Sequence, residues 1–129
     1  TLINGRAGVM PPFPQLDGKQ ITDVANYVRS LSSLPADDLK VARGADVFKS
    51  NCVACHGAEG KGNIALGAPN LTDKTWLYGS SEAVIVETVT KGRMAMMPAQ
   101  DKVLSPEKIH LLTAYVWGLT NNKQAAATK

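Results

Sequence analysis

Apolar side chains recur at the spacing of an amphipathic helix in four segments of the chain. In the first segment they are Ile21, Val24, Val28 and Leu31. The second segment begins after a possible capping residue, Asp37 or Asp38, and runs to about Asn51. Its apolar stripe is Leu39, Ala42, Ala45 and Phe48. We expect both segments to be helices that bury one face.

Capping and stop signals delimit the other two segments. Ser80 or Ser81 can cap a helix that Gly92 stops, and this helix runs through Val84, Ile85, Glu87, Thr88 and Val89. Ser105 followed by Pro106 is a strong start signal for a last helix that runs to about Leu119. No segment shows a clear strand pattern, since the ambiguous run 83–86 has a helix cap and stop around it. The pattern therefore predicts an all-α protein without strands.

Two long loops separate these helices. Residues 52–75 are rich in glycine and lack a clean period, and residues 93–104 form a second loop. A loop as long as the first is usually functional or is wrapped around something. The last residues, 121–129, are polar and rich in alanine, and we expect a flexible tail there.

An internal repeat relates the two ends of the chain. Residues 4–11 (NGRAGVMP) resemble residues 91–98 (KGRMAMMP) at an offset of 87. After a one-residue gap, the stripe of the first helix aligns with the last helix: Ile21, Val24, Tyr27, Val28 and Leu31 with Ile109, Leu112, Tyr115, Val116 and Leu119. Only the second copy has a long segment before it. We therefore expect residues 1–35 to be the end of one domain and residues 36–120 a complete domain of the same kind.

Charge and composition narrow the class of protein. The formal charge of the 129 residues is +3, from 14 basic and 11 acidic side chains, and residues 36–120 contribute none of it. No run of Lys or Arg marks a nucleic-acid surface. No apolar run is long enough to span a bilayer, and the chain opens without a signal peptide, so an exported form would be a mature or partial chain. Aromatic residues are only 5%, and a small core with few large rings often needs a prosthetic group.

The chemistry is concentrated in Cys52-Val53-Ala54-Cys55-His56. C-x-x-C-H is the attachment signature of a c-type haem. Two thiols three residues apart at a helix end can reach the two vinyl groups on one porphyrin edge. The next residue, His56, can then bind the iron as the proximal ligand. We therefore predict that Cys52 and Cys55 hold one haem c covalently.

Three other interpretations of the cysteine pair are weaker. A redox dithiol normally opens a helix after a strand, and no alternating strand–helix pattern is present. A zinc site lacks ligands, because the chain has no other cysteine and only one other histidine, His110. A structural disulfide fits poorly in so short a loop.

A methionine is the expected sixth ligand of the iron. Met97 lies 41 residues after His56 in a loop, directly before Pro98. A His/Met iron favours the reduced state and has a raised potential. Methionine also fills cores, but Met94, Met96 and Met97 share a loop and not a helical stripe. We prefer Met97, with Met96 and then Met94 behind it.

Residues 36–120 contain a helix, the C-x-x-C-H motif, a methionine loop and a last helix in that order. In this they resemble a class I cytochrome c domain. The resemblance implies three to four helices around one covalent haem, preceded here by a partial copy of the same domain. It also implies that the helix with Gly44 and Phe48 crosses the last helix near Tyr115. In such domains the carbonyl of a proline, here Pro69, accepts the Nδ1–H of the proximal histidine and fixes its tautomer.

A narrower resemblance covers nearly the whole chain. Four stretches, GKGN (60–63), LGAPNLTD (66–73), WLYG (76–79) and YVW (115–117), are similar to the second haem domain of the dihaem cytochrome c subunit of cbb-type haem–copper oxidases. Residues 1–35 resemble the end of that subunit's first haem domain. The subunit's membrane helix and first C-x-x-C-H are absent from this sequence. Residues 1–35 are then part of a fragment, a natural extension packed on the haem domain, or a segment whose Met10 competes for the iron in a swapped dimer.

The resemblance implies electron transfer, not catalysis. An iron closed by His56 and Met97 has no open site for oxygen chemistry. The implied partners are redox proteins, a donor cytochrome or oxidase subunits, in the bacterial periplasm, with a membrane anchor conceivable only in a longer form. The alternatives are a free periplasmic monohaem shuttle and a haem-free thiol-disulfide oxidoreductase.

Three side chains are candidate contacts to the haem propionates, with packing or a surface charge as the other interpretation: Trp76, Tyr78 and Arg93. Lys61, Lys74 and His110 are expected to be surface or packing residues.

Overall fold

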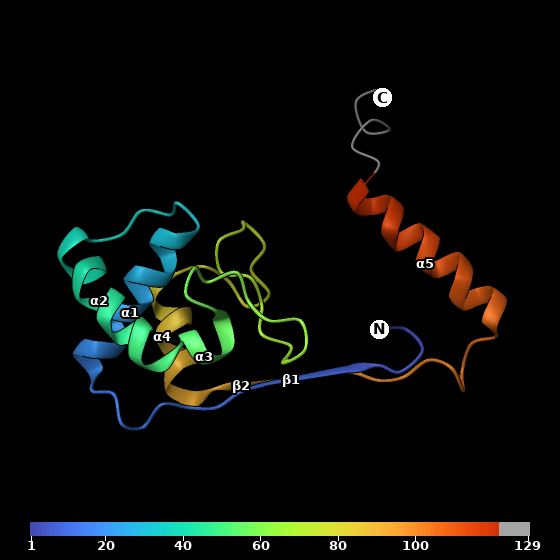
Figure 1. The fold of residues 1–129 in the computed structure, drawn as a ribbon, viewed down its shortest axis with the longest axis horizontal. Coiled ribbons are helices and arrows are strands. Elements are labelled where there is room, and N and C mark those ends of the chain that lie inside the picture. Colours follow the sequence, from blue (N-terminus) through green and yellow to red (C-terminus); the bar gives the residue numbers. More distant parts are fainter. Residues whose placement is uncertain (122–129) are drawn as a thin grey trace. The chain divides into compact units, whose positions relative to one another are not determined.

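The computed structural model describes residues 1–121, which form five helices and two short strands (Figure 1). The elements are β1 (Arg6–Met10), α1 (Gly18–Leu31), α2 (Asp38–Asn51), α3 (Val53–His56), α4 (Glu82–Lys91), β2 (Arg93–Met97) and α5 (Pro106–Asn121). The helical class is confirmed. The flexible tail expected at residues 121–129 falls, beyond Asn121, outside the described residues.

The helices begin where the capping residues indicate. The Asp37 side chain accepts a hydrogen bond from the Lys40 N–H at 2.9 Å, and Ser81 caps α4. At α1, Asp17 and Gln20 form a reciprocal capping box. Gly92 ends α4 at φ +71°, a conformation that favours glycine. Local side-chain chemistry thus sets the helix boundaries.

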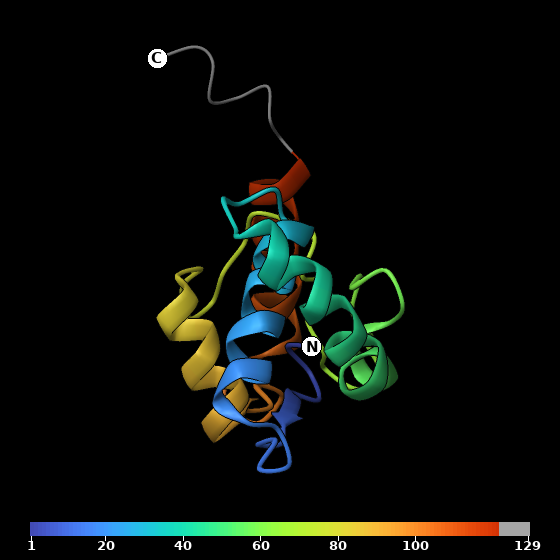
Figure 2. The ribbon, with the colours of Figure 1, turned by 90° about the vertical axis from the view of Figure 1, so that its left-hand side faces the viewer.

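The chain forms two compact units. The larger unit is Gly8–Ala95, and the smaller one joins Thr1–Ala7 to the described residues from Met96 onwards. In the larger unit α1 lies between α2 and α4 (Figure 2). Val24 and Phe48 are fully buried there. The core of this unit therefore forms around α1.

The face of α2 that carries Gly44 and Phe48 is covered by α1. The Tyr27 ring lies 5.1 Å from the Phe48 ring, centroid to centroid. Any side chain at position 44 would collide with the carbonyl oxygen of Asp23, so only glycine permits this approach. The resemblance placed Tyr115 against this face. The structure places its repeat counterpart, Tyr27, there.

The expectation of no strands is wrong. β1 and β2 pair in a two-stranded sheet, and they are the two copies of the Gly-Arg to Met-Pro repeat. Gly5 lies against the Met97 carbonyl, and Gly92 lies against the Met10 carbonyl. The start of each strand thus lies beside the end of the other, so the pair is antiparallel. Neither copy alternates apolar and polar side chains, so neither indicates a strand by itself.

The smaller unit consists mainly of α5. The Gln100 N–H donates to the Leu2 carbonyl at 2.9 Å, and Ser105 precedes the helix as expected. Ile109 is buried, whereas Tyr115 and most other apolar side chains of α5 are exposed. Within residues 1–121, no helix combines the length and apolar character needed to cross a membrane.

Candidate haem-attachment site

The cysteine pair lies where α2 ends and α3 begins. Cys52 is the C-terminal capping residue of α2, and its N–H donates to the Phe48 carbonyl at 2.8 Å. The following turn, Val53–His56, carries Cys55 and then His56. Both thiols are free, with Cys52 buried and Cys55 exposed. Residues 52–56 therefore present two thiols and an imidazole on one turn.

Burial makes the Cys52 thiol a poor nucleophile on its own. Desolvation raises its pKa to about 11, and the neighbouring Cys55 adds to the rise. Reactive dithiols instead have lowered pKa values, because the thiolate is the attacking species. This environment argues against the thiol-disulfide alternative.

The His56 imidazole is held in one orientation. His56 is buried, and its Nδ1 lies 3.1 Å from the Pro69 carbonyl oxygen. Because a carbonyl can only accept, Nδ1 must carry the proton and Nε2 must have the free lone pair. Burial lowers the pKa of His56, and the Pro69 contact opposes that shift. Burial is the larger of the two effects, so the net shift favours the neutral ring that metal binding requires.

The loop after His56 carries Pro69 back to the imidazole. The Gly62 N–H donates to the His56 carbonyl at 2.8 Å. Gly62 has φ +80°, and a side chain there would collide with Pro69. Asn63 and Ala68 then bridge the two sides of the loop. The glycine-rich composition is thus explained by a tight return past the histidine.

Tyr78 and Arg93 come together in the larger unit. The Arg93 guanidinium lies 4.5 Å from the Tyr78 ring centroid, and its Nε donates to the Thr88 hydroxyl at 3.0 Å. Trp76 packs, partly buried, against the core. A stacked Arg–Tyr pair retains donors that could bind carboxylates, so the propionate contacts stay a prediction.

The methionines are divided between the two units. Met97 belongs to the smaller unit and is 39% exposed, and Met96 is 77% exposed. Met94 lies in the larger unit but is 82% exposed. Met10 is partly buried against the core of the unit that holds His56. Met97 and His56 thus belong to different units, and the Met97 ligand stays a prediction.

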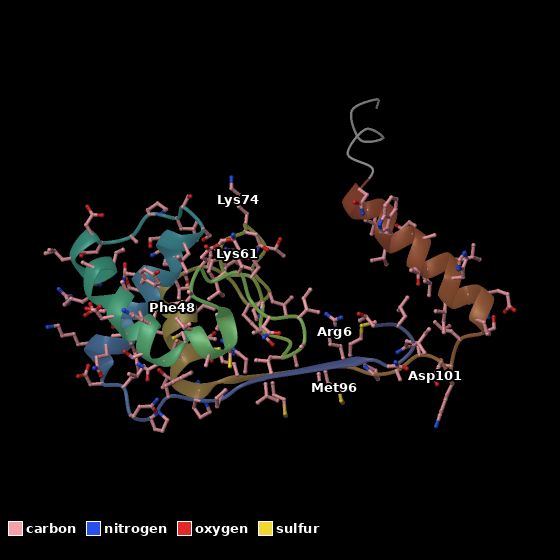
Figure 3. The ribbon with its side chains drawn as sticks, in the orientation of Figure 1. Arg6, Phe48, Lys61, Lys74, Met96 and Asp101 are labelled. Atoms are coloured by element: carbon pink, nitrogen blue, oxygen red, sulfur yellow. The ribbon has the colours of Figure 1, made fainter. Side chains whose placement is uncertain are left out.

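The remaining sequence candidates are surface residues. Lys61 and Lys74 lie on the loops between α3 and α4 and point outward (Figure 3). Lys61 forms an exposed ion pair with Glu59. His110 is exposed on α5.

The donor set fits a covalently bound haem. Two thiols and a neutral imidazole with its Nε2 lone pair free lie on one helical turn. Among the described residues, His56 forms a side-chain hydrogen bond only through Nδ1. A c-type haem takes this combination: two sulfur atoms for attachment and one nitrogen for the iron.

Comparisons with known proteins agree with this chemistry. The family model described as "Cytochrome C oxidase, cbb3-type, subunit III" matches residues 39–116. The cbb3-type cytochrome c oxidase subunit FixP of Bradyrhizobium diazoefficiens is 52% identical over 84% of this chain and 38% of its own length. FixP of Azorhizobium caulinodans is 49% identical over 87% of this chain and 39% of its own. Subunit CcoP of Rubrivivax gelatinosus is 43% identical over 98% of this chain and 42% of its own. The chain thus spans about two fifths of the length of these relatives.

Proposed function

Because the chain belongs to the family of cbb3-type cytochrome c oxidase subunit III, we propose that it transfers electrons through one covalently bound haem c. Residues 36–120 supply the haem-binding residues, and residues 1–35 are the end of a preceding domain of the same kind. The chain does no oxygen chemistry itself. It passes electrons towards the oxygen-reducing subunit of a cbb3-type oxidase.

One observation carries this proposal. His56 follows Cys52 and Cys55 on a single turn, and Pro69 holds its Nδ1 at 3.1 Å. This contact fixes the tautomer with Nε2 free for a metal. A C-x-x-C-H motif without that contact would be compatible with a dithiol. The contact favours an iron ligand.

The residues of the chain have distinct roles in this proposal. Cys52 and Cys55 would hold the haem through thioether bonds to its two vinyl-derived carbons. His56 would bind the iron through Nε2, and Met97, with Met96 as the fallback, would supply the thioether ligand. Trp76, Tyr78 and Arg93 contact the propionates. The bound haem supplies the ferrous–ferric couple, and the thioether raises its potential.

The partners follow from the same family membership. The similar proteins FixP and CcoP are named as subunits of cbb3-type oxidases. The protein would therefore exchange electrons with a donor cytochrome and with oxidase subunits. Covalent attachment of haem c takes place on the periplasmic side, so the domain faces the periplasm. A free periplasmic shuttle would need no such subunit partner.

The histidines provide a matched test. The chain is produced with haem-attachment machinery, and the absorption spectra and redox titrations of His56→Ala and His110→Ala are compared with the original chain. We expect a reversible low-spin couple that His56→Ala abolishes and His110→Ala leaves unchanged, because His110 is exposed on α5. A low-spin couple that survives His56→Ala would contradict the proposal.

A further inference from the structure

The loop between α3 and α4 contains a short hairpin. The Asn63 N–H donates to the Ala68 carbonyl at 2.9 Å, and the Ala68 N–H donates to the Asn63 carbonyl at 3.0 Å. Between these two residues, the Gly67 N–H donates to the Ile64 carbonyl at 3.3 Å, and Gly67 has φ +70°. The Asn63–Ala68 pair is therefore the stem of the hairpin, and the residues between them are its turn.

The two sides of this stem hold His56. Next to Asn63, the Gly62 N–H donates to the His56 carbonyl at 2.8 Å. Next to Ala68, the Pro69 carbonyl oxygen lies 3.1 Å from the His56 Nδ1. The backbone and the imidazole of one residue are thus bound from opposite sides of the same residue pair. The width of the stem therefore sets where the Pro69 carbonyl lies relative to the imidazole.

The Asn63 side chain closes the turn of the hairpin. Its Oδ1 accepts hydrogen bonds from the Ala65 N–H at 2.9 Å and from the Leu66 N–H at 3.4 Å. Asparagine suits this position because its short amide reaches the backbone two residues further on. The apolar side chains of Ile64 and Leu66 are 78% and 51% exposed, so packing holds the turn only weakly. The hydrogen bonds to Asn63 therefore stabilise the turn.

We propose that Asn63 is a positioning residue for the proximal iron ligand. By closing the turn it keeps the stem narrow, and the stem keeps the Pro69 carbonyl on the Nδ1–H of His56. This inference rests on the proposed function, because it concerns a ligand of the same haem. A histidine whose Nδ1–H is held by an acceptor is a more basic ligand through Nε2. A more basic ligand stabilises the ferric state, so Asn63 should lower the reduction potential.

Two measurements on the haem-loaded chain test this role. Asn63→Ala removes the amide that closes the turn. We expect hydrogen exchange of the His56 Nδ1–H in the ferrous chain to become about three- to tenfold faster, the effect of one lost hydrogen bond on a local opening. The reduction potential should rise, because the Pro69 contact is then made for less of the time.

Three further variants make the test specific. Asn63→Asp keeps an acceptor oxygen at the same distance from the backbone and should retain the slow exchange. Asn63→Gln carries its amide one methylene further out than the turn accepts, so it should behave as Asn63→Ala does. Asn70→Ala is the matched control, because the Asn70 Oδ1 accepts from the Thr72 N–H at 2.9 Å, outside the stem. It should leave both the exchange and the potential unchanged.

The outcomes separate this role from the proposed function. Unchanged exchange and potential in Asn63→Ala and Asn63→Gln would overturn the role of Asn63 and leave electron transfer through the haem intact. An equal change in Asn70→Ala would also overturn it, because general loosening of the loop would then be sufficient. A chain without attached haem would contradict the proposed function and this inference together.

Discussion

Tyr27 packs its ring 5.1 Å from that of Phe48, on the face of α2 where Gly44 lets α1 approach closely. Tyr115 is the repeat counterpart of Tyr27 and is 65% exposed on α5. The same Tyr-Val-x-x-Leu ending thus occurs in two environments in one chain. This difference supplies a matched pair of variants.

Tyr27→Ala should destabilise the haem-loaded chain by about 2–3 kcal/mol, because it removes a partly buried ring and its aromatic contact. Tyr115→Ala should change the free energy of unfolding by less than about 0.5 kcal/mol, as for an exposed surface position. Urea unfolding of the two variants makes the comparison. The opposite ranking would contradict the packing of the Tyr27 ring against Phe48.

The Asp23–Arg43 pair predicts a dependence of stability on pH. The hydrogen bond from Arg43 lowers the pKa of Asp23 below its ordinary value, and burial opposes this shift. Because the folded pKa lies below that of the unfolded chain, this stabilisation is full above about pH 4 and is lost as the pH falls through the folded pKa.

Arg43→Met leaves Asp23 buried without its partner, so it should cost about 1–3 kcal/mol at neutral pH. The difference from the original chain should shrink below about pH 4, where Asp23 becomes protonated. Lys91→Met removes only an exposed ion pair with Glu87 and should cost less than about 0.5 kcal/mol. Thermal unfolding across this pH range measures both. A constant difference at all pH values would rule out the Asp23 carboxylate as the cause.

Gly62 should be essential for the orientation of the proximal histidine. An alanine there adds backbone strain at φ +80° and a collision with Pro69, whose carbonyl binds His56. Gly57→Ala is the control, because it has strain at φ +77° but open space around the added carbon.

Gly57→Ala should cost about 1–3 kcal/mol from strain alone. Gly62→Ala should cost more, and it should also speed hydrogen exchange of the His56 Nδ1–H, followed by nuclear magnetic resonance. Unchanged exchange in Gly62→Ala would mean that the loop can shift without disturbing the Pro69 contact.

Much of the fold could be predicted from local sequence signals. Asp37, Ser81 and Gly92 mark helix ends because capping is a contact between near neighbours. The C-x-x-C-H motif lies on one turn, so its chemistry is also local. The contact between His56 and Pro69 joins residues 13 apart, and only the family resemblance implied it.

The strands and the position of α1 could not be predicted in the same way. β1 and β2 each lack alternation, and their partner lies 87 residues away in the repeat. The apolar stripes of α1 and α5 are equivalent, so the stripe does not reveal which helix covers Gly44. Asp23 and Asn26 anchor α1 through polar side chains whose partners, Arg43 and Glu82, become known only in three dimensions.

The intact mass of the denatured chain tests the central claim most directly. The chain is produced with haem-attachment machinery, beside a Cys52→Ala, Cys55→Ala double variant. We predict that the original chain retains the mass of one haem after denaturation and that the double variant retains none. A denatured chain with no added mass, or added mass that survives loss of both cysteines, would contradict covalent haem binding at this site.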